Sequence, residues 1–358
     1  MSKYNKVEAV AVVSNLTSGG AVVYKENIIR CLRHKYRVQI YSPEPYVENG
    51  KNKITNTLKY LKYCVIYLNK FYKNLAFKLN KKKIKKVIIF QDSYIKTPNI
   101  FKFLKHKTVY IFHEPPREFY ENMKLHTENI YQIIFNILFR LPIMFIDRMN
   151  MASVETIVSN SIYSKGLLQK IYGKESIVIY PGFSKIKLKK NIRRLKNCIT
   201  VGSLMRYKGH DMVIKSIGKI NINKPTLTII GNGSLKRKKL LRELAKKHDV
   251  RLTILSSLSD TELSNKYRES QTYINAAQGE PFGLTSLEAI GYGCNLVTND
   301  SGGTKELKNF FKKSVYISKN NTNDLAKKIS KSLINKVSQK VDTRYFHWRK
   351  VTSRIDKI

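Results

Sequence analysis

Short apolar runs alternate with longer segments of helix-like periodicity along almost the whole chain, and no other feature constrains the fold as strongly. The runs have the length of buried strands, and many end at glycine or polar residues; clear examples are residues 7–15, 85–92 and 225–234. This alternation is typical of βαβ units, in which helices cover a parallel sheet. The sequence therefore predicts an α/β protein with doubly wound sheets.

The length of 358 residues favours two domains, because single cores of that size are uncommon. Residues 184–196 are basic and show no clear period, which is typical of a linker. We expect Rossmann-like domains in 1–183 and 197–340, and a C-terminal helix in 341–358 that packs back toward the first domain. Ligands of such sheets bind at the carboxyl ends of the strands, so a central cleft between the two strand sets is the expected site.

The net charge is +42, from 67 Lys and Arg against 25 Asp and Glu. Such a field attracts polyanions: nucleic acid, an anionic membrane surface or phosphorylated small molecules. Much of the excess is lysine in a chain also rich in Asn, Ile and Tyr, so compositional bias of the genome is an alternative explanation. No RNP-type aromatic motif, recognition helix or zinc-finger spacing is present, which argues against a nucleic-acid partner.

Cysteine usage and hydropathy indicate the compartment. The four cysteines lie far apart without a C-x-x-C pair or a nearby histidine cluster, which favours a reducing compartment and no metal site. The N-terminus lacks the apolar core of a signal peptide. The longest apolar region, Ile130 to Ile146, contains Arg140 and Pro142 and is shorter than the roughly 20 residues of a spanning helix. We expect a buried, Pro-kinked helix there, in a cytoplasmic protein that is either soluble or peripheral on the inner face of the membrane.

The stretch "QGEPFGLTSLE" holds two glutamates, Glu280 and Glu288, eight residues apart. A glycosidase pair needs its carboxyl groups about 5 to 9.5 Å apart, whereas eight residues of helix separate their backbones by about 12 Å. An extended ligand with hydroxyls at both ends and an anionic middle fits this spacing better. The amides of Gly283, Leu284 and Thr285, at the start of a predicted helix, would face that middle and favour phosphate. The alternative is that Glu280 caps the helix and Glu288 is an ordinary surface glutamate.

Further polar residues follow other predicted strands, and each also has a purely structural interpretation. Arg206 and Lys208 in "VGSLMRYKG" could neutralise a diphosphate. The Gly19-Gly20 pair precedes a predicted helix, where its amides could approach phosphate or a reacting sugar, although a tight turn explains it equally well. Gly231 starts a G-x-G that lacks the third glycine of a dinucleotide fingerprint. His113 ends an apolar strand, at the edge where a functional histidine would lie.

Taken in order, these motifs resemble the retaining glycosyltransferases of family 4, the group 1 glycosyl transferases, which have the GT-B fold. The resemblance runs from the Gly-Gly loop and the strand-end histidine through "VSNSIYSKGLL", "VIYPGF", "VGSLMRYKG" and "IIGNGS" to "GEPFGLTSLEAIGYGCNLVTNDSGG", and so covers nearly the whole chain. The E-x7-E element with its P-F-G-L-T core and trailing S-G-G is the most specific part.

The resemblance implies a role for each of these positions. Glu280 would bind hydroxyls of the transferred sugar and Glu288 the ribose of the nucleotide. Lys208 would hold the diphosphate, helped by the amides that follow Gly283, and His113 would sit against the donor sugar at the reaction centre. The glycines at 19 and 20 would face the phosphate.

The family retains the anomeric configuration, with the leaving phosphate thought to serve as base, and it needs no bound metal. No cofactor is therefore expected, in line with the missing Asp-x-Asp motif. One departure concerns Ser203, where family members often carry Arg directly after the Gly of "VG"; whether Arg206 replaces that cation stays open.

We therefore expect transfer of a hexose from GDP-mannose or a UDP-sugar to a lipid-linked or glycan acceptor, which would be bound by the first domain. The segment "HEPPREFYE" is similar to His-x-Pro segments of members that use GDP-mannose. Two alternatives are a nucleic-acid-binding protein and a nucleotide-sugar epimerase with the GT-B fold.

The segment from Lys51 to Phe90 contains twelve lysines and no Asp or Glu. An apolar stripe repeats every three or four residues, as on one face of a helix, through Leu58, Leu61, Val65, Leu68, Tyr72, Leu75 and Leu79. Lysines fall together on a neighbouring face, at Lys59, Lys62, Lys70 and Lys73. Either the stripe packs in the core and the lysines are solvated, or residues 51–86 dock on an anionic membrane.

Overall fold

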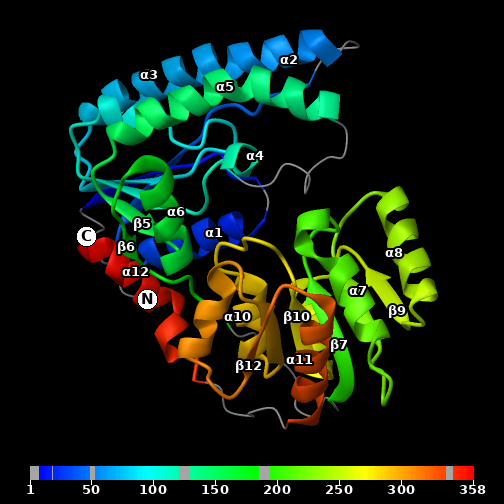
Figure 1. Cartoon of the computed structure of the whole chain (residues 1–358). Coiled ribbons are helices and arrows are strands. Elements are labelled where there is room, and N and C mark those ends of the chain that lie inside the picture. The colour runs from blue at the N-terminus through cyan, green and yellow to red at the C-terminus, as the bar shows by residue number, and fades with distance from the viewer. Residues whose placement is uncertain (1–7, 18, 49–52, 121–129, 185–193, 336–341) are drawn as a thin grey trace. The chain divides into compact units, whose positions relative to one another are not determined.

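The computed structural model describes residues 8–17, 19–48, 53–120, 130–184, 194–335 and 342–358 (Figure 1). The chain divides into two compact units. Unit 1 comprises residues 1–181 and 348–358, and unit 2 comprises residues 182–347. Within the described residues each unit contains one six-stranded sheet, and every strand pairing is parallel. The predicted α/β class with two doubly wound sheets is confirmed.

The sheet of unit 1 has the strand order β2-β1-β3-β4-β5-β6. Its central strands are runs of apolar residues buried on both faces, as expected of a parallel sheet covered by helices. The strand order reverses between β1 and β3, so the loops after these two strands diverge at the carboxyl edge. The strands are β1 (Ala9–Val13), β2 (Arg37–Tyr41), β3 (Lys86–Phe90), β4 (Thr108–Phe112), β5 (Ile157–Ser159) and β6 (Ile177–Val178).

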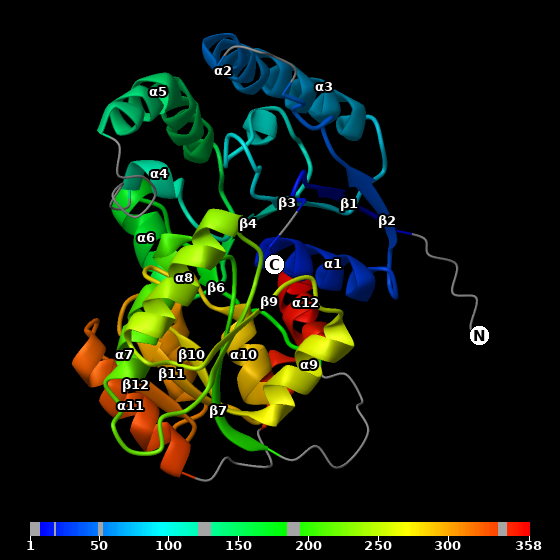
Figure 2. The same ribbon diagram turned by 90° about the vertical axis from the view of Figure 1, so that its right-hand side faces the viewer.

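Helices of unit 1 cover this sheet, and one of them comes from the end of the chain. That helix, α12, packs against α1 (Figure 2). The rings of Trp348 and Tyr24 meet there edge to face, with centroids 5.3 Å apart. The hydroxyl of Tyr36 also donates to Asp356 at 2.9 Å. The helices are α1 (Gly20–Leu32), α2 (Lys53–Lys62), α3 (Leu68–Asn80), α4 (Arg117–Tyr120), α5 (Ile130–Ala152), α6 (Ile162–Tyr172) and α12 (Trp348–Lys357), with a 3-10 turn, η2, at Asn99–Lys102.

Within the basic segment, residues 53–80 form one continuous helical rod in which α2 and α3 are joined by a π-helical turn, η1 (Tyr63–Tyr67). The second half of the predicted apolar stripe is buried at Leu68, Tyr72, Leu75 and Leu79. Leu58, in the first half, is 54% exposed. The π turn adds a residue to one turn of the helix and so rotates the face that precedes it away from the core.

Helix α5 runs through Pro142, but the expectation that this region is buried is wrong for one of its faces. Four side chains three or four residues apart are 40 to 64% exposed: Leu138, Leu141, Phe145 and Met149. Figure 1 shows α5 running along the rod, and α5 contacts α2 and η1. None of the described helices is both apolar and long enough to cross a membrane.

The sheet of unit 2 has the order β12-β11-β10-β7-β8-β9, and its strand order reverses between the neighbours β7 and β10. Most of the predicted linker lies outside the described residues, but its last two residues, Leu195 and Lys196, already belong to β7. The strands are β7 (Leu195–Val201), β8 (Leu227–Ile230), β9 (Leu252–Leu255), β10 (Ser270–Asn275), β11 (Asn295–Asn299) and β12 (Val315–Ser318).

The helices of unit 2 begin where the sequence supplies side-chain caps. Ser234, Ser259 and Asn321 each accept a backbone N–H at the start of a helix, and Ser259 forms a capping box with Glu262. The elements are α7 (His210–Gly218), α8 (Leu235–Lys247), α9 (Asp260–Glu269), α10 (Leu284–Gly291) and α11 (Thr322–Ile334), with 3-10 turns η4 (Arg206–Lys208), η5 (Gly303–Asn309) and η6 (Arg344–Phe346).

Candidate active site

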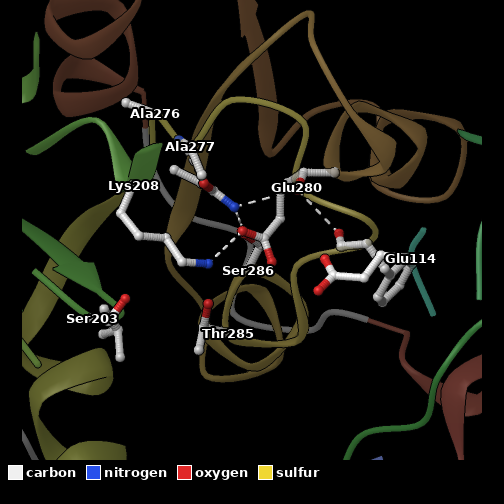
Figure 3. Close-up of polar contacts among 12 residues, drawn as sticks. Glu114, Ser203, Lys208, Ala276, Ala277, Glu280, Thr285 and Ser286 are labelled. Carbon is white, nitrogen blue, oxygen red and sulfur yellow. Dashed lines mark hydrogen bonds and ion pairs between the residues drawn. The ribbon is translucent and has the colours of Figure 1, made fainter. Parts of the chain in front are cut away.

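The two loops at the switch point of unit 2 each contribute one charged side chain, and the two side chains form an ion pair. Lys208 comes from η4, after β7, and Glu280 comes from the loop after β10. The Lys208 Nζ atom lies 2.6 Å from Glu280 Oε2, and the two side chains are 23% and 17% exposed (Figure 3). This position, beyond the carboxyl ends of two diverging parallel strands, is where α/β sheets bind their ligands.

Glycines allow the backbones of these loops to approach one another. At Gly209, φ is +73°, and a Cβ atom would lie 2.2 Å from the carbonyl oxygen of Ala276. The loop after η4 is therefore held against the loop after β10. At Gly231, a Cβ atom would lie 1.8 Å from the carbonyl oxygen of Gly202. Gly231, which we predicted as a donor-binding residue, thus has a packing role between the loops after β7 and β8.

A buried polar network supports the loop that carries Glu280. The Asn299 side chain donates to the carbonyl of Ala276 at 2.9 Å, and the Thr304 hydroxyl donates to the carbonyl of Phe282 at 3.0 Å. Asn275 donates to the Ser286 hydroxyl at 3.0 Å. The sequence reasoning did not identify this network. Its only local signal is that Asn275 and Asn299 each end an apolar strand.

Helix α10 begins at the far side of the same loop. Gly283 caps it with φ at +84°, and a Cβ atom there would lie 2.6 Å from Thr304 Oγ1. Leu284 and Thr285 are the first helical residues, and N–H groups at such positions have no partner within the helix. The Thr285 hydroxyl is 2.7 Å from that of Tyr273. These amides, together with the helix dipole, form a local positive end beside Glu280.

Glu288 lies further along α10 and is partly buried rather than an ordinary surface glutamate. Burial raises its pKa from 4.5 to about 7, although the hydroxyl of Tyr267, 3.3 Å from Oε2, favours the charged form. Near neutral pH this carboxyl group is therefore balanced between its two protonation states. It can accept hydrogen bonds from hydroxyl groups and also donate one.

Arg206, a predicted donor-binding residue, lies close to Lys208 in sequence, as does Ser203, which stands where family members often carry Arg. Arg206 is exposed within η4. The Ser203 carbonyl is 3.0 Å from His210 Nε2. Burial lowers the pKa of His210 to about 4, so this neutral ring fixes the loop without adding charge. The sequence reasoning did not identify His210.

His113 lies in unit 1, at the end of β4, and is 8% exposed. Its ring packs edge-on against Tyr24, with centroids 5.2 Å apart, and its Nδ1 is 3.5 Å from Asn160 Nδ2. Among the described residues, Nε2 has no hydrogen-bond partner. Burial lowers the pKa of His113 to about 4. A neutral imidazole with an unsatisfied nitrogen is thus presented at the carboxyl edge of this sheet.

The Gly-Gly pair of unit 1 starts helix α1, after β1. Gly19 is its cap with φ at +82°, and Gly20 is its first residue. Both are exposed, and a Cβ atom at Gly19 would meet no atom within 4 Å. The backbone angle therefore accounts for glycine at this position, and the open space leaves its amides accessible to a ligand.

Unit 2 thus brings together Lys208, Glu280 and the start of α10, while unit 1 carries His113 and the Gly19-Gly20 pair on its own sheet edge. Over the residues that the structure describes, no group of three or more His, Cys, Asp or Glu side chains could hold a metal ion.

Two Rossmann-like units with these loops define the GT-B class, and solved structures share this fold over nearly the full chain. Sucrose-phosphate synthase from Thermosynechococcus elongatus is similar with a TM-score of 0.67 and 13% identity, covering 98% of both chains. HepE of Anabaena, in complex with UDP-glucose, is similar with a TM-score of 0.65 and 14% identity, again covering 98% of both chains.

A family model matches the sequence of unit 2. Residues 184–345 match the model of the family described as glycosyl transferases group 1.

Two curated relatives match shorter regions. An uncharacterized glycosyltransferase of Methanocaldococcus jannaschii is 25% identical over 211 residues, 57% of this chain and 59% of the relative. The GtfA subunit of the UDP-N-acetylglucosamine–peptide N-acetylglucosaminyltransferase of Streptococcus pneumoniae is 32% identical over 108 residues, 30% of this chain and 21% of the relative. The chain thus spans about three fifths of the first relative's length and about a fifth of the second's.

Proposed function

We propose that this protein is a retaining glycosyltransferase of family 4 that moves a hexose from a nucleotide-diphosphate sugar to a lipid-linked or glycan acceptor. The observation that carries the proposal is the Lys208–Glu280 pair beside the start of α10, at the switch point of unit 2. A diphosphate needs cations and backbone donors, and a sugar needs hydroxyl-binding acceptors. This site supplies both within one pair of loops.

Donor binding changes the partner of Lys208. In the ligand-free site its ammonium group pairs with Glu280. A bound diphosphate competes for that cation, and the amides of Leu284 and Thr285 add to the attraction. Glu280 is then available to accept hydrogen bonds from the hydroxyls of the transferred sugar. Glu288, from the same helix, is proposed to bind the ribose.

Unit 1 is proposed to supply the groups at the reaction centre. His113 offers its unsatisfied Nε2 as a hydrogen-bond partner for a hydroxyl of the donor sugar. Because its pKa is about 4, the ring stays neutral during turnover at neutral pH. The amides at Gly19 and Gly20 are proposed to face the phosphate. The leaving phosphate acts as the base for the acceptor hydroxyl, and Lys208 with the start of α10 neutralises its charge without a metal ion.

The donor is proposed to be a UDP-sugar or GDP-mannose. Solved neighbours were crystallised with UDP and with UDP-glucose, and one curated relative is named for UDP-N-acetylglucosamine. The segment that starts at His113 is similar to those of GDP-mannose users, so both donor classes enter the test.

Thermal-shift measurement against UDP-, GDP- and ADP-sugars tests the proposal directly. A donor at 100 times its dissociation constant stabilises the folded protein by about 2.7 kcal/mol. We expect one nucleotide class to raise the melting temperature and to yield free nucleotide plus a glycosylated acceptor. An isomerised nucleotide sugar as product would instead identify an epimerase, and no stabilisation by any donor would contradict the proposed site.

We further propose that unit 1 binds the inner, anionic face of the membrane peripherally. The exposed stripe of α5 (Leu138, Leu141, Phe145 and Met149) lies on a helix that packs beside the lysine-rich rod of α2 and α3. Lys59, Lys62 and Lys73 of this rod are exposed. An apolar stripe flanked by cations is typical of helices that lie in a membrane interface.

A further inference from the structure

A groove of about 600 Å³ lies in unit 1 between the end of β2 and the rod formed by η1 and α3. On one side it is lined by Tyr41 and Ser42, where β2 ends at the carboxyl edge of the sheet. On the other side it is lined by Tyr67, Lys70, Phe71 and Lys78. Its volume is within the range of pockets that bind small ligands.

Tyr67 and Phe71 in the helical wall of the groove continue a ladder of aromatic rings that begins at Tyr63, outside the groove lining. Tyr63 and Tyr67 are stacked, with centroids 5.0 Å apart and planes at 20°. Tyr67 and Phe71 follow at 6.4 Å and 23°. Tyr67 is 37% exposed, although a tyrosine ring is a large apolar surface to leave in water. The ladder therefore presents a flat aromatic face to the solvent at the groove.

The helix has an unusual conformation at this ladder. The π-helical turn η1 spans Tyr63–Tyr67, so two of the three ladder rings belong to it. Such turns are rare inside α-helices and occur frequently at functional sites. The π-helical turn and the exposed rings are therefore two independent observations that indicate a functional site at this segment of the rod.

The opposite wall is held in place by hydrogen bonds. The Tyr41 hydroxyl donates to Gln39 Oε1 at 2.6 Å and accepts from Lys82 Nζ at 2.9 Å. The Lys82 ammonium also lies 5.5 Å from the centroid of the Tyr41 ring. This ring is thus a fixed part of the groove rather than a mobile surface side chain.

The charge around the groove has a single sign. Lys70 and Lys78 line it and are exposed, and the lining contains no Asp or Glu. Flat aromatic faces stack on the C–H faces of sugar rings, because the ring face carries negative potential. The ammonium groups attract a carboxylate or a phosphate on the same ligand. An Asn74 side chain adds a hydrogen-bonding group.

We propose that this groove binds the acceptor, and that the acceptor is an anionic glycan whose sugars carry carboxylate or phosphate groups. The role of this glycan as the acceptor rests on the proposed glycosyltransferase function. Binding of the glycan in the groove does not itself require the donor. The sugar rings lie on the ladder of Tyr67 and Phe71, and the anionic groups pair with Lys70 and Lys78.

Calorimetric titration of the full-length protein, without donor, tests the groove with three oligosaccharides of equal length. One is neutral, one carries uronic acids and one carries phosphate groups. We expect at least one charged oligosaccharide to bind tenfold or more tightly than the neutral one, and the better of the two identifies the charged group. Equal affinity for all three, no binding at all, or displacement by an acyl-chain detergent would overturn the proposal.

Variants assign the binding to the groove. Tyr67→Ala is expected to weaken binding of the preferred oligosaccharide tenfold or more, while Tyr67→Phe keeps it. Lys70→Gln with Lys78→Gln should remove the preference for charge. The matched control is Lys81→Gln with Lys83→Gln, which removes two exposed lysines of the same segment that do not line the groove. A loss of binding in the control equal to that in the groove variant would contradict the assignment.

The two proposals fail in different ways. If no nucleotide sugar stabilises the protein but the charged oligosaccharide still binds through Tyr67, the glycosyltransferase proposal fails and the groove stands as a glycan site. If a donor binds and turns over but the oligosaccharides ignore the groove variants, the groove proposal fails alone.

Discussion

Lys208 and Glu280 are 72 residues apart in the sequence, and their Nζ and Oε2 atoms lie 2.6 Å apart at the switch point of unit 2. The pair joins the loop after β7 to the loop after β10. It holds a cation and a carboxylate side by side in a partly buried site, where the proposed donor places its phosphates and its sugar.

Replacing Lys208 with Ala should lower donor turnover about 100-fold or more, as expected when a group that stabilises developing charge is removed. The measurement is nucleotide release under saturating acceptor. Glu280→Gln should also lower turnover while leaving the melting temperature nearly unchanged, because partly exposed ion pairs contribute about 1 kcal/mol or less. Lys215→Ala, at an exposed position of α7, is the control and should turn over donor like the wild type.

Replacing Gly283 with Ala should destabilise unit 2 through backbone strain and through a steric clash. A comparison with Gly173 separates these two effects. Gly283 and Gly173 both have positive φ, at +84° and +66°, but only at Gly283 would a Cβ atom meet a neighbour, Thr304 Oγ1 at 2.6 Å. Gly173→Ala is expected to cost about 1 kcal/mol of backbone strain. Gly283→Ala should add a clash of about 1–3 kcal/mol. Equal shifts in melting temperature for the two variants would mean that the loop around Gly283 relaxes around the added Cβ atom without loss of free energy of unfolding.

The pH dependence of stability should reveal the carboxyl group of Glu288. Its pKa is raised from 4.5 to about 7 in the folded protein, so between these values the folded state binds more protons than the unfolded state. Stability contributed by this group is therefore present below pH 4.5 and is lost as the pH rises through 7. Glu288→Gln removes the effect, so urea unfolding at pH 5 and pH 8 should favour the variant more at pH 8. Glu243→Gln, on the exposed side of α8, should show no such difference.

His113→Phe should preserve the packing against Tyr24 but remove Nε2 from the site. We expect near-native melting and a loss of donor turnover of tenfold or more. Because the pKa of His113 is lowered to about 4, its protonation should leave turnover unchanged between pH 6 and pH 8. A wild-type rate in the variant would remove this histidine from the reaction centre.

Membrane binding is tested by flotation with neutral and anionic vesicles. Replacing Lys59, Lys62 and Lys73 together with Gln should weaken binding to anionic vesicles about 100-fold, from roughly 1 kcal/mol for each lysine near the surface. Phe145→Asp in α5 should weaken binding further. Leu235→Asp is the matched control in unit 2, at a leucine that is 84% exposed. Equal binding to neutral vesicles, or no binding to either, would contradict the proposal.

The sheets of both units could be predicted from the sequence because a strand buried on both faces leaves a continuous apolar run. Residues 87–90, with the sequence VIIF, form such a run, and all four are buried in β3. The rod of α2 and α3 was predicted only in part. A repeat of three and four residues cannot reveal a five-residue π turn. The repeat therefore assigns Leu58 to the same apolar stripe as the buried residues of α3, although Leu58 is exposed.

Within the candidate site, the motif residues could be found from the sequence because they follow strands or begin helices. The side chains that hold them could not. Asn275 and Thr304 meet Ser286 and Phe282 only after three separate segments of unit 2 have come together. The aromatic groove had no sequence signal either, since Tyr41 and Phe71 belong to different elements and become neighbours through the fold.

The position of α12 has a consequence for the synthesis and the truncation of the protein. Unit 1 lacks the partners of Tyr24 and Tyr36 until residues 348–358 are synthesised and pack against it. A fragment that stops at residue 181 would leave that surface of α1 bare to water. Completion of unit 1 therefore waits until unit 2 has been synthesised, and deletion of α12 damages the unit whose synthesis began first.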